Sequence, residues 1–342
     1  MSATTPTDRR PSTIPYRPEL DGLRALSVLA VIVYHVPRAH GLVPAGFIGV
    51  DLFFALSGAL ITQLLLREHD DTGRVALGRF YARRLRRLYP ALLAMLAFVI
   101  VASFVAYSRA SFVSILRDAA ISGLYLASFV APFRAMPLLG HMWSLSIEEL
   151  FYLVWPLSLA IVAKSGRRAI VGLLVLVVIG AFGWRVHLWF DAMASAHRIY
   201  FAPDTRADAL AWGCLAGFAV HSGWAARARR ALLVLGPCAG LGIAILMHEA
   251  DRSATWFATW GYSLTSILAA TVVARLFVAP SAALATKPLV VVGRLSYSLY
   301  LWHIPLIAMG SDLGVPAEAS LAVAVVLAVL SYRFVESRWR AR

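Results

Sequence analysis

The sequence contains few cysteines and few charged side chains for its length. Two of its 342 residues are cysteine, and charged residues make up 15% of the chain against a hydrophobic share of 60%. Cys214 and Cys238 both fall within apolar runs, so they indicate neither a disulfide framework nor a metal site. So little charge leaves no room for a sizeable soluble domain, because such domains are about 25% charged. The composition is instead typical of a polytopic membrane protein.

Acidic residues are scarcer than basic ones. The chain has 18 Asp and Glu against 32 Lys and Arg, which gives a net charge of +14. Nucleic-acid-binding proteins can also be basic, but in a membrane protein the excess more simply reflects cytosolic loops beside anionic lipid headgroups. We therefore expect membrane lipids, and no nucleic acid, as partners. The sequence also lacks tandem repeats and low-complexity tracts.

Ten hydrophobic stretches are long enough to cross a membrane. An eleventh, 111–133, is weaker, because Arg117 and Asp118 interrupt it and a spanning helix needs about 20 apolar residues. If it crossed, the basic loops at 164–168 and 227–230 would move to the outer side, against the positive-inside rule. We therefore predict an all-α bundle of ten spans with both termini in the cytosol, and 111–133 as an interfacial or re-entrant segment on the outer side. The ten predicted spans are 20–37, 46–66, 90–107, 142–163, 169–190, 205–221, 231–248, 255–278, 288–309 and 317–335.

The N-terminal segment is polar and basic. It carries Arg9, Arg10 and Arg17 and shows no small-residue cleavage site, so residues 1–19 are expected to form a short cytosolic tail rather than a signal peptide. The transmembrane domain is predicted at 20–335, and a cytosolic C-terminal tail is predicted at 336–342.

The first predicted span carries two polar residues that need an explanation. Arg24 and His35 lie eleven residues apart, which is roughly 16 Å along a helix and about half of the hydrocarbon core. The predicted topology places Arg24 near the inner end and His35 near the outer end. Structural roles are available for both residues, because Arg24 could snorkel to the headgroups and His35 could be a packed core histidine. Whether they are functional depends on the polar residues of the other segments.

Carboxylates begin the second and sixth predicted spans. Asp51, in GFIGVDLFFALSG, falls where a helix dipole favours negative charge, so capping is its structural alternative to a functional role. In FAPDTRADALAWGCLAG, Asp204 is well placed as an N-cap and Asp208 lies one turn further on, so capping together with an ion pair between an aspartate and Arg206 is the corresponding structural interpretation.

The segment RFYARRLRRLYP, at 79–90, is basic and amphipathic. Its structural interpretation is an interfacial anchor with positive charge on the headgroups and aromatic side chains in lipid. Its functional interpretation is a phosphate-binding surface, because Arg83 and Arg86 lie one helical turn apart.

Two later segments carry polar side chains at helical spacing. In HMWSLSIEELFYLVWP, His141, Ser144 and Glu148 share one face, and a carboxylate inside a membrane helix is expected to be functional or paired. In GRLSYSLYLWHIPL, Tyr300 and His303 share a face that follows the basic residue at 294.

Taken together, these segments resemble the acyltransferase family 3 membrane enzymes. The similarity covers nearly the whole chain and rests on DGLRALSVLAVIVYH, GFIGVDLFFALSG, FYARRLRRLYP, HMWSLSIEELFYLVWP, YFAPDTRADALAWG and GRLSYSLYLWHIPL followed by RFVE. Each motif alone is weak, but six in this order are specific. Members O-acylate bacterial surface polysaccharides, peptidoglycan, lipid-linked sugars and some antibiotics. Some carry an appended extracytoplasmic esterase-like domain, which we do not expect here because the chain ends soon after its last span.

The resemblance implies roles for single residues. His35 corresponds to the proposed catalytic histidine of the family, and Arg24 corresponds to its paired arginine. Arg83 and Arg86 correspond to the cytosolic arginine motif associated with acyl-coenzyme A. Further correspondences are Glu148 in the WSLSxE segment, and Tyr300 and His303 in the aromatic-histidine segment.

These observations lead to one hypothesis for the donor. Acyl-coenzyme A, with acetyl as the expected acyl group, binds from the cytosol as a co-substrate, and we expect no permanently bound cofactor or metal. Its phosphates contact Arg83 and Arg86, with Arg24 and Arg294 as further candidates.

The acceptor is expected on the outer side of a bacterial cytoplasmic membrane. A neutral His35 removes a proton from a hydroxyl of a cell-envelope glycan or lipid-linked sugar, and Asp51 or Glu148 orients the imidazole. A covalent acyl-histidine intermediate is an alternative route. The candidate substrate-binding residues are His141, Ser144, Arg206, Asp208, Tyr300 and His303.

Two other functions are alternatives to this one. An acceptor on the cytosolic side, such as a macrolide, is compatible with the same motifs. A multi-span transporter is a different class, and the sequence shows neither an inverted repeat nor arginine clusters on both sides.

Overall fold

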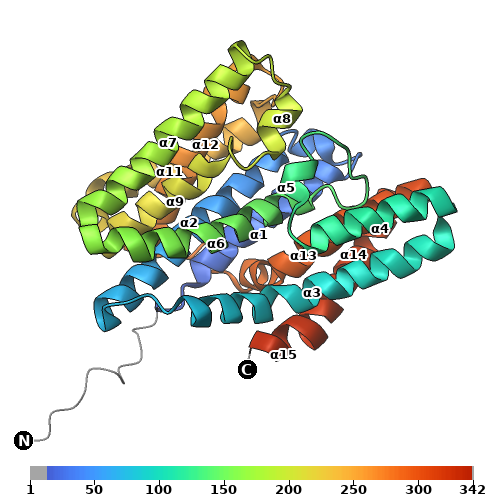
Figure 1. Cartoon of the computed structure of the whole chain (residues 1–342), viewed down its shortest axis with the longest axis horizontal. Helices are drawn as coiled ribbons and strands as arrows, with labels where there is room; N and C mark the ends of the chain where they lie inside the picture. The colour runs from blue at the N-terminus through green and yellow to red at the C-terminus, as the bar shows by residue number, and fades with distance from the viewer. Residues whose placement is uncertain (1–13, 341–342) are drawn as a thin grey trace, which may run out of the picture.

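The computed structural model describes residues 14–340, and every regular element in that range is a helix (Figure 1). Most of the predicted N-terminal tail and the last two residues of the predicted C-terminal tail lie outside the described residues. The long helices are α1 (Pro18–His35), α2 (Gly49–Thr72), α3 (Leu77–Ala106), α6 (Met142–Val162), α7 (Arg167–Phe190), α9 (Ala207–His221), α11 (Arg229–Glu249), α12 (Tyr262–Val278), α13 (Lys287–Asp312) and α14 (Ala317–Ser331). The shorter helices are α4 (Arg109–Gly123), α5 (Ala127–Val130), α8 (Ala196–Phe201), α10 (Trp224–Arg227) and α15 (Ser337–Arg340). Two π-helical turns, Phe257–Gly261 and Tyr332–Glu336, begin α12 and follow α14.

The predicted all-α membrane bundle is confirmed. Eight helices of the described chain are long and apolar enough to cross a membrane, and each overlaps a predicted span. The helix that overlaps the predicted span 90–107 begins earlier, at Leu77, because the basic segment 79–90 continues it. The other two predicted spans form α1 and α9. The first carries Glu19, Asp21 and Arg24, and the second has only 15 residues. Both are largely buried, because α1 packs against α13 and α9 packs against α2.

The segment 111–133 forms two short helices instead of a span. Helix α4 has 15 residues, which is about 22 Å and shorter than the roughly 30 Å hydrocarbon core. It folds back along the far part of α3 (Figure 1). The prediction that this segment does not cross agrees with its absence from the eight candidate spans of the described chain.

Glycines allow the central helices to touch backbone to backbone. A Cβ built on Gly213 would lie 2.4 Å from the carbonyl oxygen of Ala55, and one on Gly217 would lie 2.5 Å from that of Ala59. No larger residue fits at these two positions of α9 without moving α2. The close approach fixes the height at which the side chains of α2 and α9 meet.

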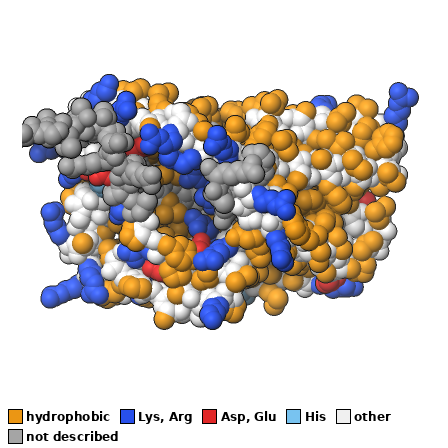
Figure 2. Space-filling view, turned by 90° about the horizontal axis from the view of Figure 1, so that it is seen from below, with side chains coloured by type: hydrophobic (Ala, Val, Ile, Leu, Met, Phe, Trp, Pro, Cys, Tyr) orange, Lys and Arg blue, Asp and Glu red, His pale blue; other side chains and the backbone are white. Residues whose placement is uncertain are grey.

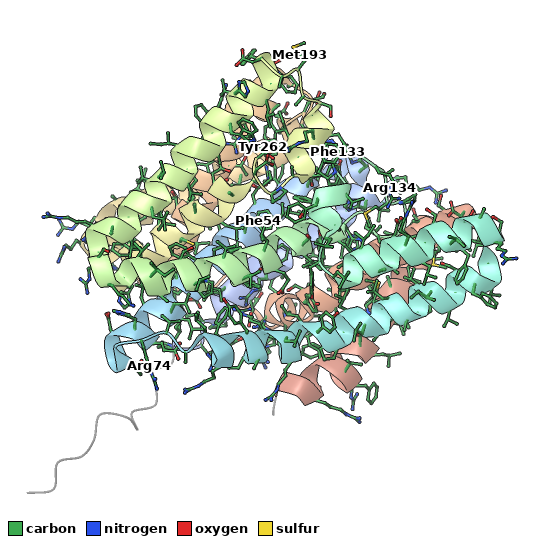
Figure 3. All side chains as sticks on the ribbon, viewed as in Figure 1. Phe54, Arg74, Phe133, Arg134, Met193 and Tyr262 are labelled. Atoms are coloured by element: carbon green, nitrogen blue, oxygen red, sulfur yellow. The ribbon has the colours of Figure 1, made fainter. Side chains whose placement is uncertain are left out.

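The bundle has two chemically different ends. In Figure 3, Arg74 lies at one end, Met193 lies at the opposite end, and Phe54 and Tyr262 lie between them. Lys and Arg side chains gather on the left part of the face in Figure 2, whereas the right part is mostly hydrophobic. We call the end of the bundle with the arginines at 24, 83, 86 and 294 the basic end. That this end faces the cytosol remains a prediction of the positive-inside rule.

Candidate active site

Three histidines from three helices meet away from the basic end. His35 is the last residue of α1, His141 immediately precedes α6, and His303 lies within α13. The ring centroid of His303 is 5.3 Å from that of His35 and 5.4 Å from that of His141. His141 and His303 are buried and His35 is half-buried. We call these three side chains the histidine cluster.

Backbone carbonyls fix the tautomer of each neutral ring. The Nδ1 atoms of His35 and His303 lie 2.7 Å from the carbonyl oxygens of residues 31 and 300, respectively. The Nε2 atom of His141 lies 3.2 Å from the carbonyl oxygen of residue 301. A carbonyl can only accept a hydrogen bond, so these nitrogens carry the hydrogen and the other ring nitrogen keeps its lone pair. His35 therefore offers a basic Nε2.

Ser144 and Tyr300 hold the cluster together. Their hydroxyl oxygens are 2.6 Å apart, and the Tyr300 hydroxyl also donates to the carbonyl oxygen of His141 at 3.0 Å. The ring of Tyr300 lies 5.3 Å from that of His303. The structure thus brings together four of the predicted substrate-binding residues, and their role toward a substrate remains a prediction.

Asp51 lies in a separate, fully buried ionic centre. It accepts a hydrogen bond from Arg206 at 2.6 Å, and neither side chain is exposed. Asp208 pairs with Arg185 through two bonds of 2.8 and 2.6 Å. Arg206 therefore pairs with an aspartate of α2 and not with an aspartate of its own segment. No contact joins Asp51 to His35 in the described structure, where Asp51 binds Arg206 and His35 binds the backbone carbonyl of residue 31, and a role of Asp51 toward the imidazole stays a prediction.

Sequence reasoning missed Arg185. It is not among the predicted site residues, although an arginine within the last two turns of an apolar span is a signal of a buried, paired charge. Arg185 is fully buried and also donates to the carbonyl oxygens of Thr205 and Thr259 at 2.5 and 3.1 Å. This one side chain connects α7 with the start of α9 and the turn before α12.

Glu148 belongs to neither the histidine cluster nor the ionic centre. Its Oε1 accepts hydrogen bonds from the hydroxyls of Ser57 and Tyr152. The Arg84 guanidinium lies 4.5 Å above the ring of Tyr152. Glu148 is seven residues beyond His141, or about 10 Å along α6. The structure brings Glu148 against α2 and near a basic side chain of α3 rather than against His35, so its orienting role stays a prediction.

Two predicted donor-binding arginines meet at the basic end. Arg24 donates to Asp21 at 2.8 Å, and Arg294 lies 3.8 Å from the other carboxylate oxygen. The side chain of Tyr16 bridges Asp21 and Arg294, since its hydroxyl donates to Asp21 and accepts from Arg294.

Arg83 and Arg86 are exposed on α3 at the same end. A hydrogen bond of 2.8 Å from the Tyr297 hydroxyl to the carbonyl oxygen of Leu88 connects α13 with α3. This bond lies one turn beyond Arg294 on α13 and two residues beyond Arg86 on α3. The Tyr297 bond thus places Arg83 and Arg86 of α3 beside the α13 turn that follows Arg294. Among the described residues, ionic contacts through Asp21 join Arg24 and Arg294 but do not reach the two arginines of α3.

The bundle, the histidine cluster and the basic end define a polytopic membrane protein with two separated polar sites. Residues 17–332 match a family model described as "Acyltransferase domain", so the chain belongs to acyltransferase family 3, as its motifs predicted. It is 32% identical over 357 residues to the O-acetyltransferase OatA of Staphylococcus aureus strain NCTC 8325 / PS 47, which covers 96% of this chain and 58% of that protein. It is also 32% identical over 352 residues to the putative O-acetyltransferase SAR0937 of strain MRSA252, over 95% of this chain and 57% of that protein.

The chain thus spans less than two thirds of the length of these curated relatives. No solved structure matches it significantly.

Proposed function

We propose that this chain is a membrane-embedded O-acyltransferase that moves an acyl group, with acetyl expected, from acyl-coenzyme A to a hydroxyl of a cell-envelope glycan or lipid-linked sugar. Family membership and the printed names of the relatives support an O-acyltransferase. The observation that carries the proposal is the arrangement along α1, where a paired arginine stands near one end and a histidine with a free basic nitrogen stands at the other.

The basic end is the proposed donor site. Coenzyme A carries several phosphates, and guanidinium groups bind phosphate oxygens through charge-assisted hydrogen bonds. Arg83 and Arg86 are exposed and one turn apart, so both can reach the same phosphate group. Arg24 and Arg294 share Asp21, which leaves further donors of both guanidinium groups for a ligand.

The chemistry follows from the tautomer of His35. Its Nε2 takes the proton of the acceptor hydroxyl as that oxygen attacks the thioester carbonyl. The new ester C–O bond forms, the C–S bond breaks, and the proton passes from the imidazolium to the departing thiolate. The carbonyl oxygen of Val31 fixes the ring as the aspartate does in a Ser-His-Asp triad, although without its negative charge.

The position of the histidine cluster favours an acceptor on the outer side. His35 lies roughly 16 Å from Arg24 along the helix, so the donor must extend its acyl arm into the bundle to reach it. An acceptor that entered from the basic end would have to share this path with coenzyme A. The envelope glycan is therefore preferred to a cytosolic metabolite.

The donor site is tested with the double variant Arg83→Ala/Arg86→Ala in lipid nanodiscs. Each lost charge-assisted contact is worth about 1.5–3 kcal/mol, so acetyl-coenzyme A affinity should fall tenfold or more. Equilibrium binding of acetyl-coenzyme A measures this change. The control is Arg229→Ala/Arg230→Ala, which removes the same charge from exposed positions at the start of α11. Equal affinities for the two double variants would show that this stretch of α3 is only an interfacial anchor.

A further inference from the structure

Two nitrogens of the histidine cluster are buried without a partner. Among the described residues, Nε2 of His303 and Nδ1 of His141 make no hydrogen bond, although both rings are buried. They are the nitrogens that keep a lone pair once the opposite nitrogen donates to a backbone carbonyl. A buried acceptor left without a donor costs free energy, so such groups usually have a partner that is a water or a ligand.

The missing partner must be a donor. His35 Nε2 is a third lone-pair nitrogen in the same cluster, and the hydroxyls of Ser144 and Tyr300 are already engaged with each other and with a carbonyl. A carboxylate, phosphate or carbonyl oxygen cannot be this partner, because it has no hydrogen to donate to the free nitrogens. A metal ion is not indicated either, because no three His, Cys, Asp or Glu side chains in residues 14–340 are placed to hold one.

We propose that the histidine cluster binds three hydroxyls of the acceptor, and that His303 and His141 are specificity-determining contacts beside His35. One hydroxyl donates to Nε2 of His35 and reacts, and two further hydroxyls donate to the free nitrogens of His303 and His141. The substrate class is therefore a polyhydroxyl compound such as a sugar, since an alcohol with a single hydroxyl leaves two of the three nitrogens unsatisfied. This inference rests on the proposed acyl transfer and adds the chemistry by which the acceptor is chosen.

The two rings use opposite nitrogens, which provides a crossed test. An Asn amide occupies the place of Nδ1 and a Gln amide occupies the place of Nε2. His303→Asn therefore keeps the bond to the carbonyl of residue 300 and removes the free acceptor, whereas His303→Gln does the reverse. At His141 the roles are exchanged, because its Nε2 binds the backbone and its Nδ1 is free.

The four variants are compared in nanodiscs with saturating acetyl-coenzyme A and an N-acetylglucosamine oligosaccharide as the acceptor probe. We expect kcat/KM for the oligosaccharide to fall at least tenfold more in His303→Asn than in His303→Gln, and at least tenfold more in His141→Gln than in His141→Asn, mainly through KM. A purely structural role for the rings predicts the opposite order at both positions. That order, or equal losses in all four variants, would overturn the proposal.

A second measurement separates this inference from the proposed function. Nitrogen-15 spectra of histidine-labelled wild type in nanodiscs should show a lone pair on Nε2 of His303 and on Nδ1 of His141, and both signals should shift when the oligosaccharide or glycerol is added. A protonated or reversed ring at either position, or signals that neither probe shifts, would overturn the inference whatever the activity. The expected spectra in a protein that transfers no acyl group to any hydroxyl, water included, would instead refute the proposed function.

Discussion

His35→Ala is expected to lower acyl transfer by about 10²–10⁴-fold while acetyl-coenzyme A still binds. General-base catalysis contributes this much, and the residue acts on the acceptor hydroxyl rather than on the donor phosphates. His35→Gln should be nearly as inactive, because it keeps size and hydrogen bonding but has no basic nitrogen. The measurement is the initial rate of labelled acetyl transfer by the purified variants, together with equilibrium binding of acetyl-coenzyme A.

The matched control for this prediction is His40→Ala. His40 is exposed and only five residues further along, and its ring contacts Tyr34 as that of His35 does. Its loss should leave the rate within a few-fold of wild type. Transfer at the wild-type rate by a folded His35→Ala protein would contradict the assignment of His35 as the base.

Arg185→Met is expected to destabilise the protein by about 3–5 kcal/mol, because it leaves Asp208 as an unpaired charge in the bundle interior. The double variant Arg185→Met/Asp208→Leu should recover much of the loss, since it removes both buried charges together. The melting temperatures of the wild type, the single variant and the double variant are compared by the loss of helical signal on heating in nanodiscs.

An exposed ion pair serves as the comparison. Arg38 and Glu318 are paired at 3.2 Å with side chains 80% and 48% exposed, so Arg38→Met should change stability by no more than about 1 kcal/mol. Equal melting temperatures for Arg38→Met and Arg185→Met would show that the buried pair contributes no more to stability than the exposed pair. A double variant less stable than Arg185→Met would contradict the charge argument itself.

Hydropathy and charge were sufficient to predict the helices. All ten predicted stretches form helices of the described chain, because an apolar run bounded by basic loops has few other structures available in lipid. Hydropathy alone does not identify two of these helices as membrane spans: α1 carries acidic residues, and α9 has only 15 residues. They lie in the middle of the bundle, where neighbouring helices rather than lipid surround the polar groups.

Side-chain partners were harder to predict than helices. The sequence placed Asp51, His35 and Glu148 at related depths, but depth does not say which face of a helix meets which neighbour. Asp51 faces α9, because backbone contacts at Gly213 and Gly217 bring that helix against α2. The pairing of Arg185 with Asp208 could not be predicted from the sequence, because it depends on how α7, α9 and α12 pack against one another. The three histidines were each predicted as candidate site residues, because they are polar side chains within or beside apolar helices. Their contact with one another was not predicted.

The central claim is that donor and acceptor react from opposite faces of one membrane protein. The most direct test uses the protein in sealed liposomes, with labelled acetyl-coenzyme A outside and the N-acetylglucosamine oligosaccharide trapped inside. Protein molecules whose basic end faces outward should acetylate the trapped oligosaccharide, and the His35→Ala protein should not. Acetylation that occurs only when both substrates are on the same side of the liposome membrane would contradict the account.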